Sequence, residues 1–243
     1  EMLKGDHYQI DEMLFVIEEL KKLSAKSYKK ELFSIAKNFY SSTPKGNWEP
    51  KKIFNQKNIL LLGAGNSINE HKDFIENYIQ REKPIVLALN ANMHINSELI
   101  NYRIASHPLR ILADAKKFQN LNQPIITPAD LSSKKNKIWE NKKICNYGLK
   151  IENDKFIIGD NFCIVPYSNV LAYALSILAS GNAMNVYIAG FDGYTLNSLN
   201  SYSSKGKFKF DYVRLDLDFL YTKSYKYYPL DPYTLDIFDL FKN

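Results

Sequence analysis

The sequence is poor in cysteine, histidine and long apolar runs, and each shortage argues against a class of protein. Two of the 243 residues are cysteines, Cys145 and Cys163, and four are histidines, with no close pairing of the two types. Neither a structural zinc site nor a disulfide framework is therefore expected, and we interpret both cysteines as reduced structural thiols. Apolar runs such as residues 59–62 and 85–89 are far shorter than the roughly 20 residues that span a bilayer.

Secretion signals and low-complexity segments are also missing. Glycine and proline number only 10 and 9, and no stretch near the start combines the charged, apolar and small residues of a signal peptide. We therefore expect a soluble protein of the cytoplasm. Because the chain begins Glu1-Met2, without a methionine at position 1, we interpret it as a fragment or a processed chain, which leaves room for a domain upstream.

The charge is positive but spread out. A net charge of +6 suits an anionic partner. The lysines come in scattered pairs rather than in one dense run, and no zinc finger or aromatic RNA-binding motif is present. We therefore expect no nucleic-acid partner and interpret the lysines as a solvated surface.

The first fifty residues predict a separate helical unit. In residues 8–40, apolar side chains recur at three- and four-residue spacing with charged side chains opposite them, in two successive stretches. Residues 41–50 are rich in turn-forming types and indicate a linker. We expect a helical hairpin and linker over residues 1–50 and a second domain over residues 51–243.

From residue 51 onward, short apolar runs alternate with helical stretches. This alternation predicts an α/β fold with a doubly wound, mainly parallel, Rossmann-like sheet, to which the N-terminal helical hairpin is attached. Residues 131–160 are polar and weakly patterned, which is compatible with an insertion or a small hairpin. The strands are expected at residues 58–62, 84–89, 102–106, 125–126 and 185–189, and two helices at 69–81 and 168–178.

A glycine-rich turn follows the first of these strands. Gly63 and Gly65 permit a tight turn and a close approach to a ligand, and Asn66 and Ser67 lead into the next helix, whose N-terminal N–H groups favour phosphate. A nucleotide-binding turn and a plain strand-to-helix turn both fit this spacing.

The residues around this turn narrow the choice of nucleotide. A dinucleotide fingerprint has a third glycine where this chain has Ile68, and an acidic residue where it has Asn90. No Gly-Lys-Ser/Thr follows, which argues against a P-loop. Asn90 offers a donor and an acceptor to a ribose or base, although a plain turn role fits it too.

Further polar residues follow other predicted strands. Because the carboxyl ends of parallel strands share one edge, we expect Asp192 and Tyr194 beside the glycine turn. Asp192 has the chemistry of an acid, a base or a metal ligand, and also of a turn cap. His107 is the first candidate for a general acid or base and His94 the second, with a turn role before Pro108 as the alternative for His107.

These motifs together resemble the bacterial lipooligosaccharide sialyltransferases and the related motility-associated-factor proteins, which transfer nonulosonates. The resemblance spans about residues 57–225 and lies in residues 63–67 (GAGNS), in Asn90, in the helix that begins near Ser168, and in residues 190–194 (GFDGY). It implies a CMP-sugar donor and a glycan acceptor.

The resemblance also implies roles for single residues. Ser168 would lie near the nucleotide, and Tyr194 and Tyr202 would assist the departing phosphate. The family has an asparagine where this chain has Ala64, and its catalytic histidine lies beyond those tyrosines, whereas this chain has no histidine after His107. Either another group, such as Asp211 or Asp216, replaces it, or the chemistry is different or lost. The residues that would bind the CMP-sugar are Gly63, Gly65, Ser67 and Asn90.

The first forty residues resemble the C-terminal end of a hydroxymethylglutaryl-CoA-lyase-like aldolase, which implies an aldolase domain upstream. We therefore expect a sialyltransferase-like glycosyltransferase of cell-surface polysaccharide and lipopolysaccharide biosynthesis. No cofactor is expected beyond the CMP-sugar, while metal dependence, peripheral membrane proximity and oligomer formation stay open. The alternatives are a non-catalytic nucleotide- or sugar-binding module appended to an aldolase, and an interaction domain whose glycine turn is purely structural.

Overall fold

The structure is a computed structural model. It describes residues 44–65, 67–91, 94–107, 111, 114–128, 142–152, 155–166 and 169–191. The helical hairpin expected within residues 1–50 lies outside this part of the chain except for its linker from residue 44, and the tail after Phe191 lies outside it too. Every structural statement below concerns the described residues.

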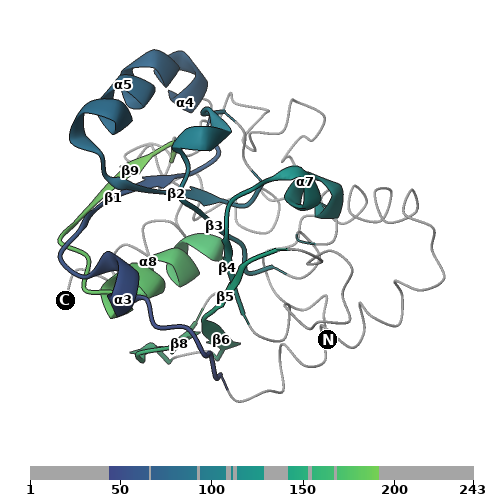
Figure 1. The fold of residues 1–243 in the computed structure, drawn as a ribbon. Helices are drawn as coiled ribbons and strands as arrows, with labels where there is room; N and C mark the ends of the chain where they lie inside the picture. The colour runs from purple at the N-terminus through teal and green to yellow at the C-terminus, as the bar shows by residue number, and fades with distance from the viewer. Residues whose placement is uncertain are drawn as a thin grey trace, which may run out of the picture.

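A parallel sheet forms the centre of the molecule (Figure 1). Its strand order is β5-β4-β3-β2-β1-β9, and every pairing within it is parallel. The doubly wound, Rossmann-like α/β fold expected from the alternating pattern is thereby confirmed. The strands are β1 (Asn58–Leu62), β2 (Ile85–Leu89), β3 (Tyr102–Ile104), β4 (Ile125–Thr127), β5 (Ile144–Asn146) and β9 (Asn185–Ala189).

Helices cover both faces of this sheet, and the side chains of β1 pack against helices on both sides. Ile59 and Leu61 belong to the apolar cluster shared with α8, whereas Leu60 and Leu62 belong to the cluster shared with α5. A strand buried on both faces has the continuous apolar run that the sequence shows. Figure 1 places α4 and α5 on one side of the sheet and α8 on the other. The helices are α3 (Lys51–Phe54), α4 (Ser67–Glu70), α5 (Lys72–Glu82), α7 (Ala115–Asn120) and α8 (Val170–Ser180).

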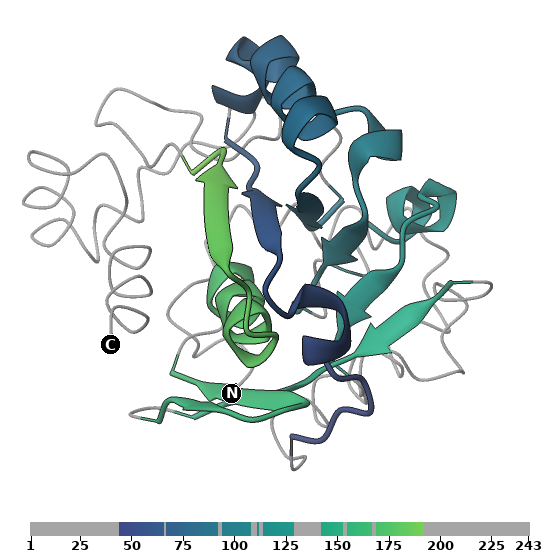
Figure 2. The ribbon, with the colours of Figure 1, turned by 60° about the vertical axis from the view of Figure 1, so that its left-hand side comes forward.

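A second, small sheet begins within residues 131–160, the stretch expected to be an insertion or a small hairpin, and continues beyond it. It contains β6 (Gly148–Ile151), β8 (Phe162–Val165) and β7 (Ile157–Ile158), in the order β6-β8-β7. The pair β7–β8 is antiparallel and makes a short hairpin, while β6 pairs with β8 in parallel. Figure 2 shows this sheet beside α8, away from α5.

One helix differs from the sequence-based expectation: the helix expected over residues 69–81 is divided at His71 into α4 and α5. Gly181 follows α8 with a φ of −73°, and the next residue, Asn182, is left-handed with a φ of 53°. β9 is an edge strand of the described sheet, and its Tyr187 is 46% exposed.

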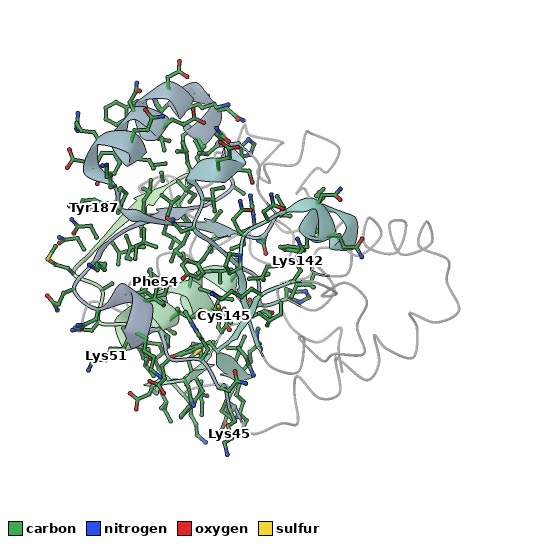
Figure 3. All side chains as sticks on the ribbon, in the orientation of Figure 1. Lys45, Lys51, Phe54, Lys142, Cys145 and Tyr187 are labelled. Carbon is green, nitrogen blue, oxygen red and sulfur yellow. The ribbon has the colours of Figure 1, made fainter. Side chains whose placement is uncertain are left out.

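Both cysteines are buried and unpaired, and Figure 3 shows Cys145 within the body of the molecule. Burial raises the pKa of the Cys163 thiol to about 12 and also raises the pKa of Cys145. Because the thiolate is the reactive form, neither thiol should react with Ellman's reagent in the native protein at neutral pH, and both should react after denaturation. Rapid native reaction of either thiol would contradict this prediction.

In the described part of the chain, no helix is both long and apolar enough to cross a membrane.

Candidate functional site

The candidate site is the edge of the sheet at which β1, β2 and β9 end. β1 has β2 on one side and β9 on the other, so the chain winds outward from β1 in one direction and later returns on its other flank. In open α/β sheets, ligands bind outside the carboxyl ends of the strands at such a switch point. Gly63, Asn90 and Gly190 are the residues that follow these three strands.

The glycine turn after β1 is fastened to the end of β9. The N–H of Gly63 donates to the carbonyl of Ala189 at 2.8 Å, and the N–H of Gly65 donates to the carbonyl of Gly190 at 2.8 Å. A Cβ on Gly63 would lie 2.4 Å from the Gly190 oxygen. Gly63 therefore lets the ends of two strands meet, and the N–H groups of Gly63 and Gly65 bind protein backbone rather than a phosphate.

Ile68 explains why no third glycine is needed here. Its side chain is fully buried, and a Cβ on Gly190 would lie 2.4 Å from its Cδ1 atom. Gly190 also has a φ of 76°, which favours glycine. The close contact between helix and strand is thus provided by Gly190, and Ile68 fills the space above it. α4 is only four residues long, which weakens the expected contribution of a helix N-terminus to phosphate binding.

Asn90 lies at the end of β2 with its main chain held on both sides. It has a φ of 56°, a conformation that asparagine tolerates better than most residues. Its N–H donates to the carbonyl of Ile104 at 2.8 Å, and its own carbonyl accepts from Nη1 of Arg103 at 3.3 Å. The main chain of Asn90 is therefore fixed at the candidate site, and Asn90 is half-buried there.

Arg103 is a residue that the sequence analysis missed. It is fully buried in β3, and Nε donates to Oε1 of Gln123 at 3.1 Å. Desolvation lowers the pKa of Arg103 to about 10, so the guanidinium is still charged at neutral pH. A single arginine between Tyr102 and Ile104 was the only signal in the sequence, and it does not by itself indicate burial.

Two histidines follow strands at this edge. Nδ1 of His94 lies 2.7 Å from Oδ1 of Asn69 on α4, and burial lowers the pKa of His94. Because an amide oxygen only accepts, Nδ1 carries a proton in this contact, and the lowered pKa keeps the ring neutral at neutral pH. His107 follows β3, and its carbonyl accepts from the N–H of Ile111 at 2.9 Å, the i to i+4 spacing of a helical turn.

The structure brings Gly63, Gly65 and Gly190 together and places Asn90 after the neighbouring strand. Ser67 begins α4 directly after the turn. Among the described residues, no group of acidic, histidine and cysteine side chains has the arrangement of a metal site. The remaining candidate residues lie outside the described part of the chain: Asn66, Ser168, Asp192, Tyr194, Tyr202, Asp211 and Asp216.

The fold and this edge define a Rossmann-like α/β domain with a candidate ligand site at its switch point. In comparisons with known proteins, no family model and no curated protein matches the chain.

Proposed function

We propose that the chain binds a nucleotide-activated sugar, a CMP-sugar, at the carboxyl edge of β1, β2 and β9. The observation that carries this proposal is the joining of the two glycine turns at the switch point, with Asn90 held after the adjacent strand. We further propose a sialyltransferase-like glycosyltransferase of cell-surface polysaccharide biosynthesis, which acts in the cytoplasm. Support for the transferase activity comes from the sequence motifs at residues 63–67 and 190–194.

The proposed reaction is a displacement at the anomeric carbon. The acceptor hydroxyl forms a new bond to that carbon, the bond to the phosphate oxygen of CMP breaks, and CMP leaves with the electron pair. The hydroxyl proton passes to a general base. A neutral histidine suits this role, and His94 with its proton on Nδ1 has the lone pair on Nε2. His107 is the other candidate, and Tyr194 and Tyr202 remain predictions for assisting the phosphate.

The test is a titration of the whole chain with CMP, CDP, UDP, GDP and NAD, with and without magnesium, followed by thermal shift and calorimetry. Asn90→Gly keeps the left-handed backbone and removes the amide. We expect it to weaken CMP binding about tenfold, the effect of losing one to two hydrogen bonds to the ligand.

Asn182→Gly is the matched control for this test. Asn182 has a similar φ of 53°, but it precedes β9 and so lies at the opposite edge of the sheet, where its amide donates to Asn55. We expect this variant to bind CMP as the parent chain does. Equal affinity of Asn90→Gly and the parent, or no response to any nucleotide, would refute the proposal.

One observation favours a second candidate function. The N–H groups of Gly63 and Gly65 are engaged by β9, which suits a non-catalytic module whose glycine turn is structural. Such a module, appended to an aldolase-type enzyme, would bind a nucleotide or sugar without reaction. Release of CMP from a CMP-sugar, faster with the protein than without it, would support the transferase and exclude this alternative.

A further inference from the structure

We propose that Arg103 is the positioning residue of the candidate site, and that it holds Asn90 in the conformation from which its amide reaches a ligand. The effect on nucleotide affinity rests on the proposed function, whereas the hold on Asn90 does not. Arg103 itself is buried under the β2–β3 connection and is not assigned a contact with the ligand.

The connection from β2 to β3 explains why a buried side chain is needed there. In a doubly wound fold this crossover is usually a helix, whose own backbone bonds keep it in place. Here the described part of residues 90–101 contains only one 3₁₀ turn, η1 (Ser97–Leu99). Polar side chains of the surrounding elements therefore hold much of this segment.

Several such side chains anchor the crossover along its length. Near its middle, Asn69 contacts His94, and a carboxylate oxygen of Glu76 accepts from the N–H of Asn96 at 2.8 Å. At its end, Oδ1 of Asn101 accepts from the N–H of Val86 at 2.7 Å. These contacts hold the middle and the end of the crossover, whereas Asn90, at its start, is held by other groups.

Arg103 holds both the start and the later part of the crossover. Nη1 binds the carbonyl of Asn90, and Nε binds Gln123, whose Nε2 in turn donates to the carbonyl of Ser97 at 2.7 Å. Burying a guanidinium destabilises the fold unless the group is well hydrogen-bonded, and an apolar residue at this position of β3 would carry no such desolvation free energy. The arginine is explained if its hydrogen bonds to Asn90 and Gln123 are required.

The left-handed conformation of Asn90 makes this hold consequential. A non-glycine residue at a φ of 56° is stable only when its surroundings fix it. The N–H of Asn90 is fixed by Ile104 and its carbonyl by Arg103. Loss of the guanidinium should therefore release one side of this residue and let the amide side chain sample other positions.

The experiment compares Arg103→Met with the control Arg81→Met in the full chain. Arg81 is exposed and pairs with its neighbour Glu82, so its loss should change nothing at the site. With ¹⁵N-labelled asparagine, hydrogen exchange can be followed at the main-chain N–H of each asparagine. We expect Arg103→Met to speed this exchange at Asn90 at least about tenfold and to leave it unchanged at Asn182. CMP affinity should fall about tenfold, a loss comparable to that of Asn90→Gly.

A double-mutant cycle separates positioning from general loosening. If Arg103 acts through Asn90, Arg103→Met should cost no further CMP affinity in an Asn90→Gly background. An equal loss in both backgrounds would overturn the proposal. Gln123→Leu keeps the cation but removes its anchor, and it serves if Arg103→Met does not fold; it should speed Asn90 exchange in the same direction.

The two proposals fail in different ways. Unchanged exchange at Asn90 in folded Arg103→Met or Gln123→Leu would overturn the positioning role. Faster exchange at Asn90, together with a parent chain that binds no nucleotide, would support the positioning role and overturn the proposed function.

Discussion

Gly63→Ala should destabilise the protein by about 3 kcal/mol, the sum of overpacking and a weakened backbone hydrogen bond. The new Cβ would lie 2.4 Å from the Gly190 oxygen and 2.9 Å from Cε2 of Phe191. The first of these is a main-chain atom held by the N–H of Gly65, so it has little room to move. Relief of the clash requires the ends of β1 and β9 to separate.

Thermal unfolding followed by circular dichroism measures this effect. For a domain of this size, the expected destabilisation lowers the Tm by roughly 6–12 °C. Gly159→Ala is the matched control, because the three atoms nearest to its Cβ would be ring atoms of Phe162, the closest at 2.4 Å. A half-buried ring can rotate, so we expect a cost of about 1 kcal/mol. Equal Tm values for the two variants would show that the turn does not need glycine.

The glycine motif after β1 can have two roles, which Gly63→Ala helps to distinguish. A sequence with Gly63 and Gly65 after an apolar strand indicates either a phosphate cradle or a turn that admits close packing. The hydrogen bonds to Ala189 and Gly190 support the second role directly. They leave ligand contacts to other groups at this edge, such as the amide of Asn90, which is why the binding test is made there.

The central strands β1 and β2 could be predicted from the sequence because burial on both faces leaves a continuous apolar run. β9 is an edge strand, yet it lies, like β1 and β2, within one residue of its expected bounds. β5 could not be predicted: its three residues, Ile144 to Asn146, follow a lysine-rich stretch, and they become a strand by pairing with β4. β6 could not be predicted either, because it becomes a strand by pairing with β8, which lies further along the chain.

The candidate site was predictable in its location and less so in its contacts. The rule that strand ends share an edge placed the residues after β9 beside the glycine turn, and Gly63 and Gly190 do lie together, while Asp192 and Tyr194 lie outside the described residues. That the N–H of Gly65 binds Gly190 depends on a strand far along the chain, and no local pattern indicates it. Arg103 was missed for the same reason, since its burial depends on Gln123 and on a crossover that is not a helix.

Tyr173→Ala should destabilise the protein by about 4 kcal/mol, the usual effect of removing a large buried aromatic side chain. Tyr173 lies on α8 with no exposed surface, and its ring centroid is 5.9 Å from that of Tyr147. Its hydroxyl donates to the carbonyl of Tyr147 at 2.5 Å, and burial raises the pKa of this phenol, so it stays a neutral donor. The Tm should fall by roughly 8–16 °C.

Two variants control for the hydroxyl and for the residue type. Tyr173→Phe keeps the ring and leaves the Tyr147 carbonyl without this donor, for an expected cost of about 1–2 kcal/mol. Tyr187→Ala removes a tyrosine that is 46% exposed on β9 and that Figure 3 shows at the edge of the molecule, and it should cost about 1 kcal/mol or less. A Tyr173→Ala protein as stable as Tyr187→Ala would contradict the burial of α8.

Tyr173 is connected to the candidate site through α8. Tyr147 directly precedes β6, and its hydroxyl contacts the carbonyl of Phe162 at 2.8 Å, so Tyr173 and Tyr147 together join α8 to the small sheet. α8 leads through Gly181 into β9, the strand that ends at Gly190. Loosening α8 should therefore reduce the protection of the Gly65 amide from hydrogen exchange, even though Tyr173 makes no contact with the glycine turn.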